Sequence, residues 1–218
     1  MSRATDELLV PLEPVSAVPE IGLVNDLLTL TKARLSLLVV MTTFVGFCVA
    51  SGPHLDWVLL VHTVGGTTLA AAAAAALNQW MESHVDRLME RTRHRPLPGG
   101  RMKPHQALSF GVFLGATGVG WLAFTAGMLS AALAAATILI YLLLYTPLKR
   151  RTAWCTIVGA VSGAIPPVIG WTAAQPSRSA FGSDVGAWIL FGILFTWQMP
   201  HFLAIAWMYR DEYAQAGF

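Results

Sequence analysis

Long apolar runs separated by short polar segments make up most of the chain from residue 35 onward. A transmembrane helix needs roughly 20 mostly apolar residues to cross the hydrocarbon core. Stretches without Asp, Glu, Lys or Arg that reach or nearly reach this length are Leu35–Gly52, Trp57–Leu77, Gln106–Leu148, Thr152–Ser177 and Val185–Tyr209. The third would be about 65 Å long as a single helix. It must therefore fold back on itself, with a turn predicted at Gly127, and the pattern predicts six membrane spans.

The basic residues support this count. Of 14 Lys and Arg, all but Arg178 fall on one side of a six-span arrangement, and the positive-inside rule then places the N-terminus in the cytoplasm. The charged fraction of 12% is about half that of a soluble domain. Because topology explains the basic residues, the net charge of +2 gives no reason to expect nucleic acid as a partner. The sequence therefore predicts an all-α, polytopic transmembrane helical bundle.

Residues 1–27 differ from the rest, being acidic and proline-containing without the pattern of a cleavable signal peptide. We expect a flexible cytoplasmic leader here, with a short interfacial helix at Ile21–Leu30, followed by one transmembrane domain over residues 28–218. The two cysteines, Cys48 and Cys155, fall in different spans and are not expected to form a disulfide.

Four oxygen-bearing residues recur at intervals of four where the second apolar run ends: Asn78, Glu82, Asp86 and Glu90. Four residues on an α-helix turn through about 400°, so this set forms one polar stripe. Acidic groups at a membrane surface are costly unless they bind something, and Mg²⁺ with a diphosphate suits them. Glu90 is the weakest member, and we expect it to pair with a nearby arginine.

Basic residues that follow the stripe fit the same ligand. Arg91, Arg93 and Arg95 belong to a helix end or loop, where a guanidinium can bind phosphate oxygens bidentately. Further candidates for diphosphate contacts on the same side are Lys32, Arg34, Lys149 and Arg150. The alternative is an ordinary cytoplasmic loop whose acids and bases pair at the surface.

A second acidic pair, Asp211 and Glu212, directly follows the last span on the same predicted side. A second Mg²⁺ held there would help to neutralise a departing diphosphate. His201 lies about two turns before this pair and is a candidate substrate contact, although a bond to a backbone carbonyl would also explain it. Trp80 and Trp197 could stabilise a cation through their ring faces, or simply pack.

Four segments together resemble a known family. They are the stripe Asn78, Glu82 and Asp86; Arg91-Thr92 with Arg95-Pro96-Leu97-Pro98; Tyr145-Thr146-Pro147-Leu148-Lys149-Arg150 with Thr152; and Pro200-His201-Phe202 with Tyr213 and Ala216-Gly217. This combination resembles the protohaem IX farnesyltransferases (haem O synthases), a branch of the UbiA superfamily of membrane prenyltransferases. The resemblance covers residues 28–218.

The resemblance implies a function and a site. Asn78, Glu82 and Asp86 would form the first Mg²⁺-diphosphate motif, with Arg91 and Arg95 as its adjoining basic positions. Glu212 stands where the family usually has aspartate, and the position four residues earlier is Met208, so only part of a second metal site is present. The expected metal-binding, catalytic set is therefore Asn78, Glu82, Asp86 and Glu212. The expected substrate-binding set is Lys32, Arg91, Arg95, Lys149, Arg150 and His201.

The resemblance also implies substrates, partners and extent. The expected reaction is transfer of a farnesyl group from farnesyl diphosphate to a vinyl group of haem B, giving haem O, in a bacterial plasma (inner) membrane. Association with haem A synthase or with terminal oxidase assembly would follow. The family has nine membrane helices, so a chain with six is expected to be truncated at its C-terminus.

Two other functions stay open at this stage. A UbiA-type transferase acting on a quinone precursor or another aromatic acceptor would use the same metal chemistry. A transporter or structural membrane protein is the alternative of a different class, since broken helices are common in transporters. Transport sites lie near the midplane, however, whereas these acidic residues gather at one face.

Overall fold

The structure is a computed structural model that describes residues 22–149, 151–175 and 184–210. Over these ranges the regular structure is helical, and six segments are long and apolar enough to cross a membrane. They are Ala33–Ser51, Trp57–Asp86, Pro104–Thr125, Met128–Leu148, Cys155–Ala174 and Val185–Met208. The predicted all-α fold and the predicted count of six spans are confirmed.

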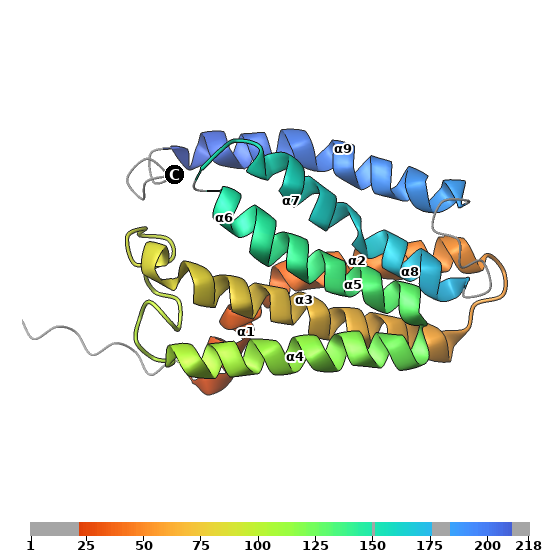
Figure 1. Ribbon diagram of the computed structural model, residues 1–218, viewed down its shortest axis with the longest axis horizontal. Coiled ribbons are helices and arrows are strands. Elements are labelled where there is room, and N and C mark those ends of the chain that lie inside the picture. The colour runs from red at the N-terminus through yellow and green to blue at the C-terminus, as the bar shows by residue number, and fades with distance from the viewer. Residues whose placement is uncertain (1–21, 150, 176–183, 211–218) are drawn as a thin grey trace, which may run out of the picture.

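Short helices and helix junctions complete the described part of the chain (Figure 1). In chain order the elements are α1 (Leu23–Leu30), α2 (Ala33–Ser51), α3 (Trp57–Asp86), α4 (Pro104–Thr125), α5 (Met128–Leu139), the π-helix η1 (Ile140–Tyr145), α6 (Thr146–Leu148), α7 (Cys155–Ala164), α8 (Pro166–Ala174) and α9 (Val185–Met208). The fourth span is α5, η1 and α6 in succession, and the fifth is α7 and α8.

The predicted turn at Gly127 is present. This residue has φ 97°, a backbone conformation that side-chain-bearing residues rarely adopt, and it directly precedes α5. A helix is also present where the interfacial helix was expected, as α1. The rest of the predicted leader, residues 1–21, lies outside the described residues.

Helix α3 is longer than the hydrocarbon core requires. Its 30 residues span about 45 Å, whereas the core is about 30 Å thick. The last turns of α3 therefore extend beyond the apolar layer and carry Asn78, Glu82 and Asp86. The helix ends at Asp86, so Glu90 lies in the turns that follow and does not continue the stripe.

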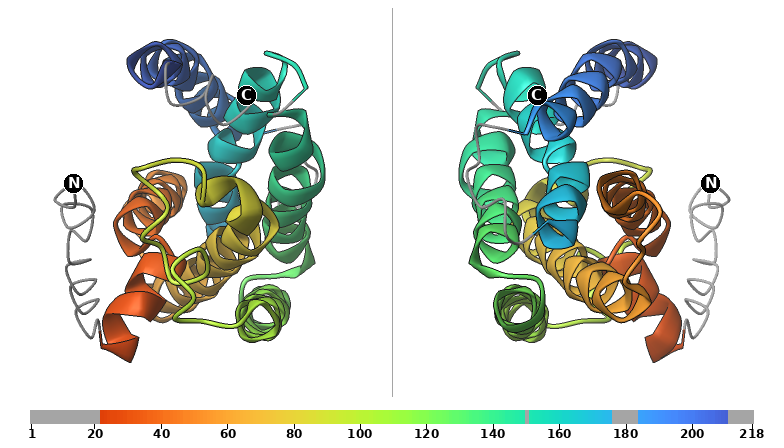
Figure 2. Two further views of the ribbon diagram at one scale, coloured as in Figure 1. Left: turned by 90° about the vertical axis from the view of Figure 1, so that its left-hand side faces the viewer. Right: turned by 90° about the vertical axis from the view of Figure 1, so that its right-hand side faces the viewer.

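The helices run roughly along the long axis of the molecule, so connections gather at two ends (Figure 1). At one end lie the loop of residues 87–103, α6 and the last turns of α9, and we call this the charged end. The connections between α2 and α3 and between α4 and α5 lie at the opposite end. Views along the long axis show the membrane-spanning helices arranged side by side in one bundle (Figure 2).

Close approach of backbones holds the bundle together. Between α2 and α8, a Cβ on Gly46 would overlap the backbone carbonyl of Pro167, and a Cβ on Gly170 would overlap that of Thr43. Small residues are used in this way where membrane helices pack without a hydrophobic driving force between them. The main core cluster lies in the same region and includes Phe47 and Ile169.

Much of the outer surface is apolar. Phe124 is 93% exposed, and Val185, Ile189 and Ile193 of α9 are also largely exposed. Soluble monomers rarely expose large apolar side chains in such numbers, whereas lipid chains cover them without exposing them to water. Together with the six spans, this surface identifies the chain as an integral membrane protein.

Candidate active site

Asn78 is the centre of the polar network at the charged end. It is 1% exposed, and its Oδ1 accepts a hydrogen bond from Lys32 Nζ at 2.8 Å. Its Nδ2 donates to Thr146 Oγ1 at 3.1 Å, and Tyr141 Oη lies 3.4 Å from Oδ1 as a further donor. The amide therefore joins α3 to the start of α2 and to the fourth span.

Each carboxylate of the stripe is paired with a cation from another element. Lys149 Nζ lies 3.4 Å from Glu82 Oε1, and Arg95 Nη1 lies 2.7 Å from Asp86 Oδ2. Asp86 is buried at the C-terminal end of α3, where the helix dipole disfavours negative charge. The positive charge of Arg95 compensates Asp86 for the unfavourable helix dipole and for the hydration lost on burial.

The loop of residues 87–103 is held in a fixed shape that positions Arg95. Thr92 is buried and its hydroxyl donates to the carbonyl of Asp86 at 2.9 Å, which closes the end of α3. Leu97 is buried against α1 and α4 residues. Arg101 binds both carboxylate oxygens of Asp26 in α1, at 2.9 to 3.1 Å. The loop is therefore tied to the bundle on both sides of Arg95.

Lys32 adopts a strained backbone conformation. Its φ of 48° and ψ of 49° are left-handed, the one positive φ among the described non-glycine residues. The adjacent carbonyls of Thr29 and Leu30, at the end of α1, both accept from Gln79 Nε2. Burial, with a smaller contribution from the nearby Arg95, lowers the pKa of Lys32 to about 8 against the opposing effect of Glu82.

The charged side chains of the site do not balance one another. Three cations, Lys32, Arg95 and Lys149, face two carboxylates, Glu82 and Asp86, which leaves one net positive charge. A diphosphate ester carries up to about three negative charges, and Mg²⁺ adds two positive ones. With both present the cluster would be close to neutral, so the site has the right charge for a Mg²⁺-diphosphate.

The donor chemistry fits Mg²⁺ as well. An amide oxygen and two carboxylates share one face of α3, and Mg²⁺ prefers oxygen ligands. No group of three or more His, Cys, Asp or Glu side chains gathers within the described ranges. Mg²⁺ usually takes one or two carboxylates and fills its remaining positions with water and substrate phosphates, and Glu82 and Asp86 supply two carboxylates on α3.

The other predicted site residues are distributed differently. Glu90 is exposed and pairs with Arg93 at 3.2 Å, so the expectation that it pairs with an arginine is confirmed. The guanidinium of Arg91 lies 5.0 Å above the ring of Tyr209, which brings the loop next to the end of α9. His201 is exposed on α9 with its ring stacked on Trp197 at 4.9 Å. Arg150, Asp211 and Glu212 lie outside the described residues.

Three residues that contact the site were not singled out from the sequence for that role: Gln79, Tyr141 and Thr146. The sequence pattern does not reveal the last two, because Tyr141 and Thr146 are five residues apart and an α-helix would bond residues four apart. The π-helical turn of η1 brings them together. Trp80, by contrast, packs against the buried cluster of Leu30 and Leu97, which supports the packing interpretation for that residue.

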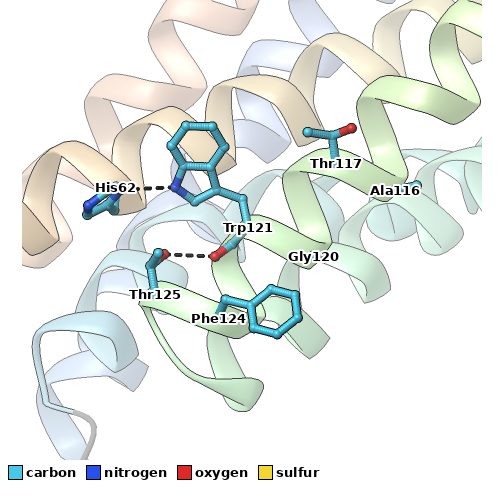
Figure 3. Close-up of a pocket in the computed structure, with 7 residues that line it drawn as sticks. All are labelled: His62, Ala116, Thr117, Gly120, Trp121, Phe124 and Thr125. Carbon is cyan, nitrogen blue, oxygen red and sulfur yellow. Dashed lines mark hydrogen bonds between the residues drawn. The ribbon is translucent and has the colours of Figure 1, made fainter.

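A separate groove of about 440 Å³ lies between α3 and α4, away from the stripe (Figure 3). It is lined by His62, Thr117, Trp121, Phe124 and neighbouring small residues. Within it the indole N–H of Trp121 donates to His62 Nδ1 at 3.1 Å. Nδ1 of His62 therefore acts as an acceptor within an otherwise apolar wall.

Comparison with solved structures identifies the fold. The fold superimposes with a TM-score of 0.73 on a digeranylgeranylglyceryl phosphate synthase, over 89% of this chain and 66% of that one. It superimposes with a TM-score of 0.70 on a UbiA homologue from Archaeoglobus fulgidus bound to DMAPP and Mg²⁺, over 88% of this chain and 66% of that one. Both are 16% identical in sequence, so they establish the fold, that of the UbiA-type membrane proteins.

Sequence comparison then gives the family. The pattern of the UbiA prenyltransferase family matches residues 39–218, so the chain belongs to that family. It is 46% identical over 202 residues to a protoheme IX farnesyltransferase from Solibacter usitatus, covering 88% of this chain and 68% of that protein. For the protoheme IX farnesyltransferase of Myxococcus xanthus the identity is 48% over 193 residues, covering 88% and 64%. The human mitochondrial protoheme IX farnesyltransferase is 45% identical over 189 residues, covering 87% and 41%. The chain thus spans about two thirds of the length of the bacterial relatives.

Proposed function

We propose that this chain acts as a protohaem IX farnesyltransferase, which binds the diphosphate of farnesyl diphosphate and transfers the farnesyl group to haem B to give haem O. The observation that carries the proposal is the convergence of Lys32, Arg95 and Lys149 on the stripe of Asn78, Glu82 and Asp86. The identity of 46–48% with two bacterial protoheme IX farnesyltransferases supports haem B as the acceptor.

The contacts support the roles proposed for the stripe and for Lys32, Arg95 and Lys149, and the resemblance to the family supplies the others. Asn78, Glu82 and Asp86 would hold Mg²⁺, and Glu212 is proposed as a carboxylate for a second ion. Lys32, Arg95 and Lys149 would bind phosphate oxygens once substrate replaces the ion pairs of the free protein. Arg91, Arg150 and His201 are proposed as further substrate contacts. When bound, Mg²⁺ supplies charge neutralisation for the leaving diphosphate.

The reaction begins as the bond between C1 of the farnesyl group and the diphosphate oxygen breaks, and the electron pair leaves with diphosphate. The cations of the site stabilise the charge that develops on this leaving group, which lowers the barrier to ionisation. The π electrons of a haem B vinyl group then form a bond to C1. Water adds to the resulting cation beside the porphyrin and loses a proton, which completes the hydroxyethylfarnesyl group.

The arrangement of the bundle supports a placement for these substrates. The charged end would face the cytoplasm of a bacterial inner membrane, because the basic loops gather there. The diphosphate would bind at this end and the isoprenoid chain would lie among apolar helices. A site at one face rather than at the midplane favours a transferase over a transporter.

The test is an assay on membranes that contain the complete protein, supplied with farnesyl diphosphate, Mg²⁺ and haem B. We expect haem O and diphosphate to form, and both to stop when a chelator removes Mg²⁺. If 4-hydroxybenzoate is prenylated and haem B is not, the acceptor is wrong and the protein acts on a quinone precursor. Without diphosphate release from either acceptor, the assignment as a prenyltransferase fails.

Two arginines of one loop provide a matched pair of variants. Arg95→Gln removes a cation that is 19% exposed and bonded to Asp86, and it should raise KM for farnesyl diphosphate at least about tenfold. Arg93→Gln removes a cation that is 53% exposed and pairs with Glu90, and KM should not change. Equal KM values for the two variants would contradict the placement of the diphosphate.

A further inference from the structure

The π-helical turn of η1 lies in the wall of the candidate site. A π turn contains one residue more than an α turn, which rotates everything after it by about 100° about the helix axis. Regular α-helical bonding resumes immediately, since Lys149 N–H donates to the carbonyl of Tyr145. The extra residue therefore sets the direction in which Thr146 and Lys149 leave the helix, toward α3.

Thr146 closes this π turn with two bonds to one acceptor. Its backbone N–H and its hydroxyl both donate to the carbonyl of Tyr141, the hydroxyl at 2.8 Å. A hydroxyl has a single proton to donate, and here that proton is used within its own helix. Toward α3, Oγ1 of Thr146 can therefore act as an acceptor only.

This has a direct consequence for Asn78, whose amide presents a donor on one side and an acceptor on the other. Because Thr146 Oγ1 can only accept, it selects Nδ2 of Asn78, and the bond of 3.1 Å is fully buried. The amide oxygen is then turned the opposite way, where Lys32 Nζ and Tyr141 Oη both present protons to it. Every partner of this amide agrees with one orientation.

We propose that Thr146 is a positioning residue that fixes the Asn78 amide with its oxygen facing the diphosphate site. The inference rests on the proposed function, because the oxygen faces a ligand only if Mg²⁺ and a diphosphate bind at this site. Without the Thr146 acceptor the amide would keep only the donors of Lys32 and Tyr141, and when Lys32 turns to the phosphate the amide would present its NH₂ group to Mg²⁺ for part of the time. Each such orientation repels the ligand, so affinity would fall even with the carboxylates intact.

The test compares Thr146→Val, which keeps the shape and removes the hydroxyl, with Thr146→Ser, which keeps the hydroxyl. The complete protein in detergent is melted in the presence of inorganic diphosphate at increasing Mg²⁺ concentrations, and the Mg²⁺ concentration that gives half of the rise in Tm is measured. We expect this concentration to increase about tenfold in Thr146→Val and to stay within about threefold of the unmodified value in Thr146→Ser.

Thr137→Val provides the matched control in the same span. Its hydroxyl donates to the carbonyl of Leu133 and has no contact with Asn78. A merely structural role for Thr146 would lower the Tm without ligand and leave the Mg²⁺ concentration dependence as it is in the Thr137→Val control. That result would overturn the inference while the unmodified protein still responded to Mg²⁺ and diphosphate. If the unmodified protein shows no such response, the proposed function fails first and this inference fails with it.

Discussion

Asp86→Asn is the substitution that most directly tests the metal assignment. Asp86 is 1% exposed, lies at the end of α3 and accepts from Arg95 at 2.7 Å. Asparagine has nearly the same shape, and its amide oxygen can accept the same bond from Arg95. The change therefore removes one negative charge and one metal-binding oxygen while it preserves the packing.

The cost in stability can be worked from that contact. A bond between two charged groups lies at the upper end of the range of about 1.5–3 kcal/mol for hydrogen bonds to charged groups, and one in which only Arg95 is charged lies at the lower end, so the loss is about 1–2 kcal/mol. Removing a negative charge from the C-terminal end of a helix returns a few tenths of this. For a chain of this size, 1 kcal/mol lowers Tm by about 2–4 °C, so we expect a decrease of about 2–8 °C. The protein stays folded at the assay temperature.

The effect on turnover should be much larger. Removing one preorganised group that stabilises a developing charge typically lowers kcat by about 10²–10³-fold. We would measure haem O formation from farnesyl diphosphate and haem B in membranes, together with Tm of the purified protein. Glu90→Gln is the matched control, because it also neutralises a carboxylate, but one whose side chain is 81% exposed and pairs with Arg93. An Asp86→Asn protein with activity within threefold of the unmodified protein would refute the metal assignment.

Three further outcomes are expected. The value of kcat/KM for farnesyl diphosphate should fall as pH rises through about 8, because Lys32 loses its proton there. Lys32→Arg should abolish this fall, and an unchanged pH profile in that variant would exclude Lys32 as the source of the fall. Gly46→Ala should lower Tm strongly, since its Cβ would overlap the backbone of Pro167, whereas Gly120→Ala, which meets no atom within 4 Å, should leave Tm unchanged or higher. Gln79→Leu should raise KM for farnesyl diphosphate and lower Tm, because it removes both bonds to the end of α1 that precede Lys32; no change in KM would show that the turn at Lys32 holds its shape without them.

The comparison of sequence with structure is clearest along α3. The interval of four residues correctly predicted that Asn78, Glu82 and Asp86 share one face of a helix. The same interval placed Glu90 on that face, and this was wrong because the helix ends at Asp86. A buried hydroxyl from Thr92 bonds the carbonyl of Asp86 and turns the chain into the loop. Periodicity cannot show where such a contact ends a helix.

The basic residues show the opposite limit. From the sequence, Lys32, Arg95 and Lys149 were candidates among several cations on one side of the membrane, with an ordinary basic loop as the alternative. The structure separates them from Arg93, which pairs with Glu90 at the surface. Lys32, Arg95 and Lys149 lie 46, 9 and 67 positions away from their partners in the chain. Contacts between residues so far apart cannot be read from a local sequence pattern.

The sequence by itself determined the all-α membrane architecture, its six spans and the acidic stripe. These depend on the length of apolar runs and on helical periodicity, both of which act over a few consecutive residues. Only the tertiary structure decided which cations meet that stripe, that Lys32 takes a left-handed turn, and that a π-helical turn brings Thr146 to Asn78. These depend on how helices distant in the chain pack against one another, because a buried polar group takes whichever partner packing places within its reach.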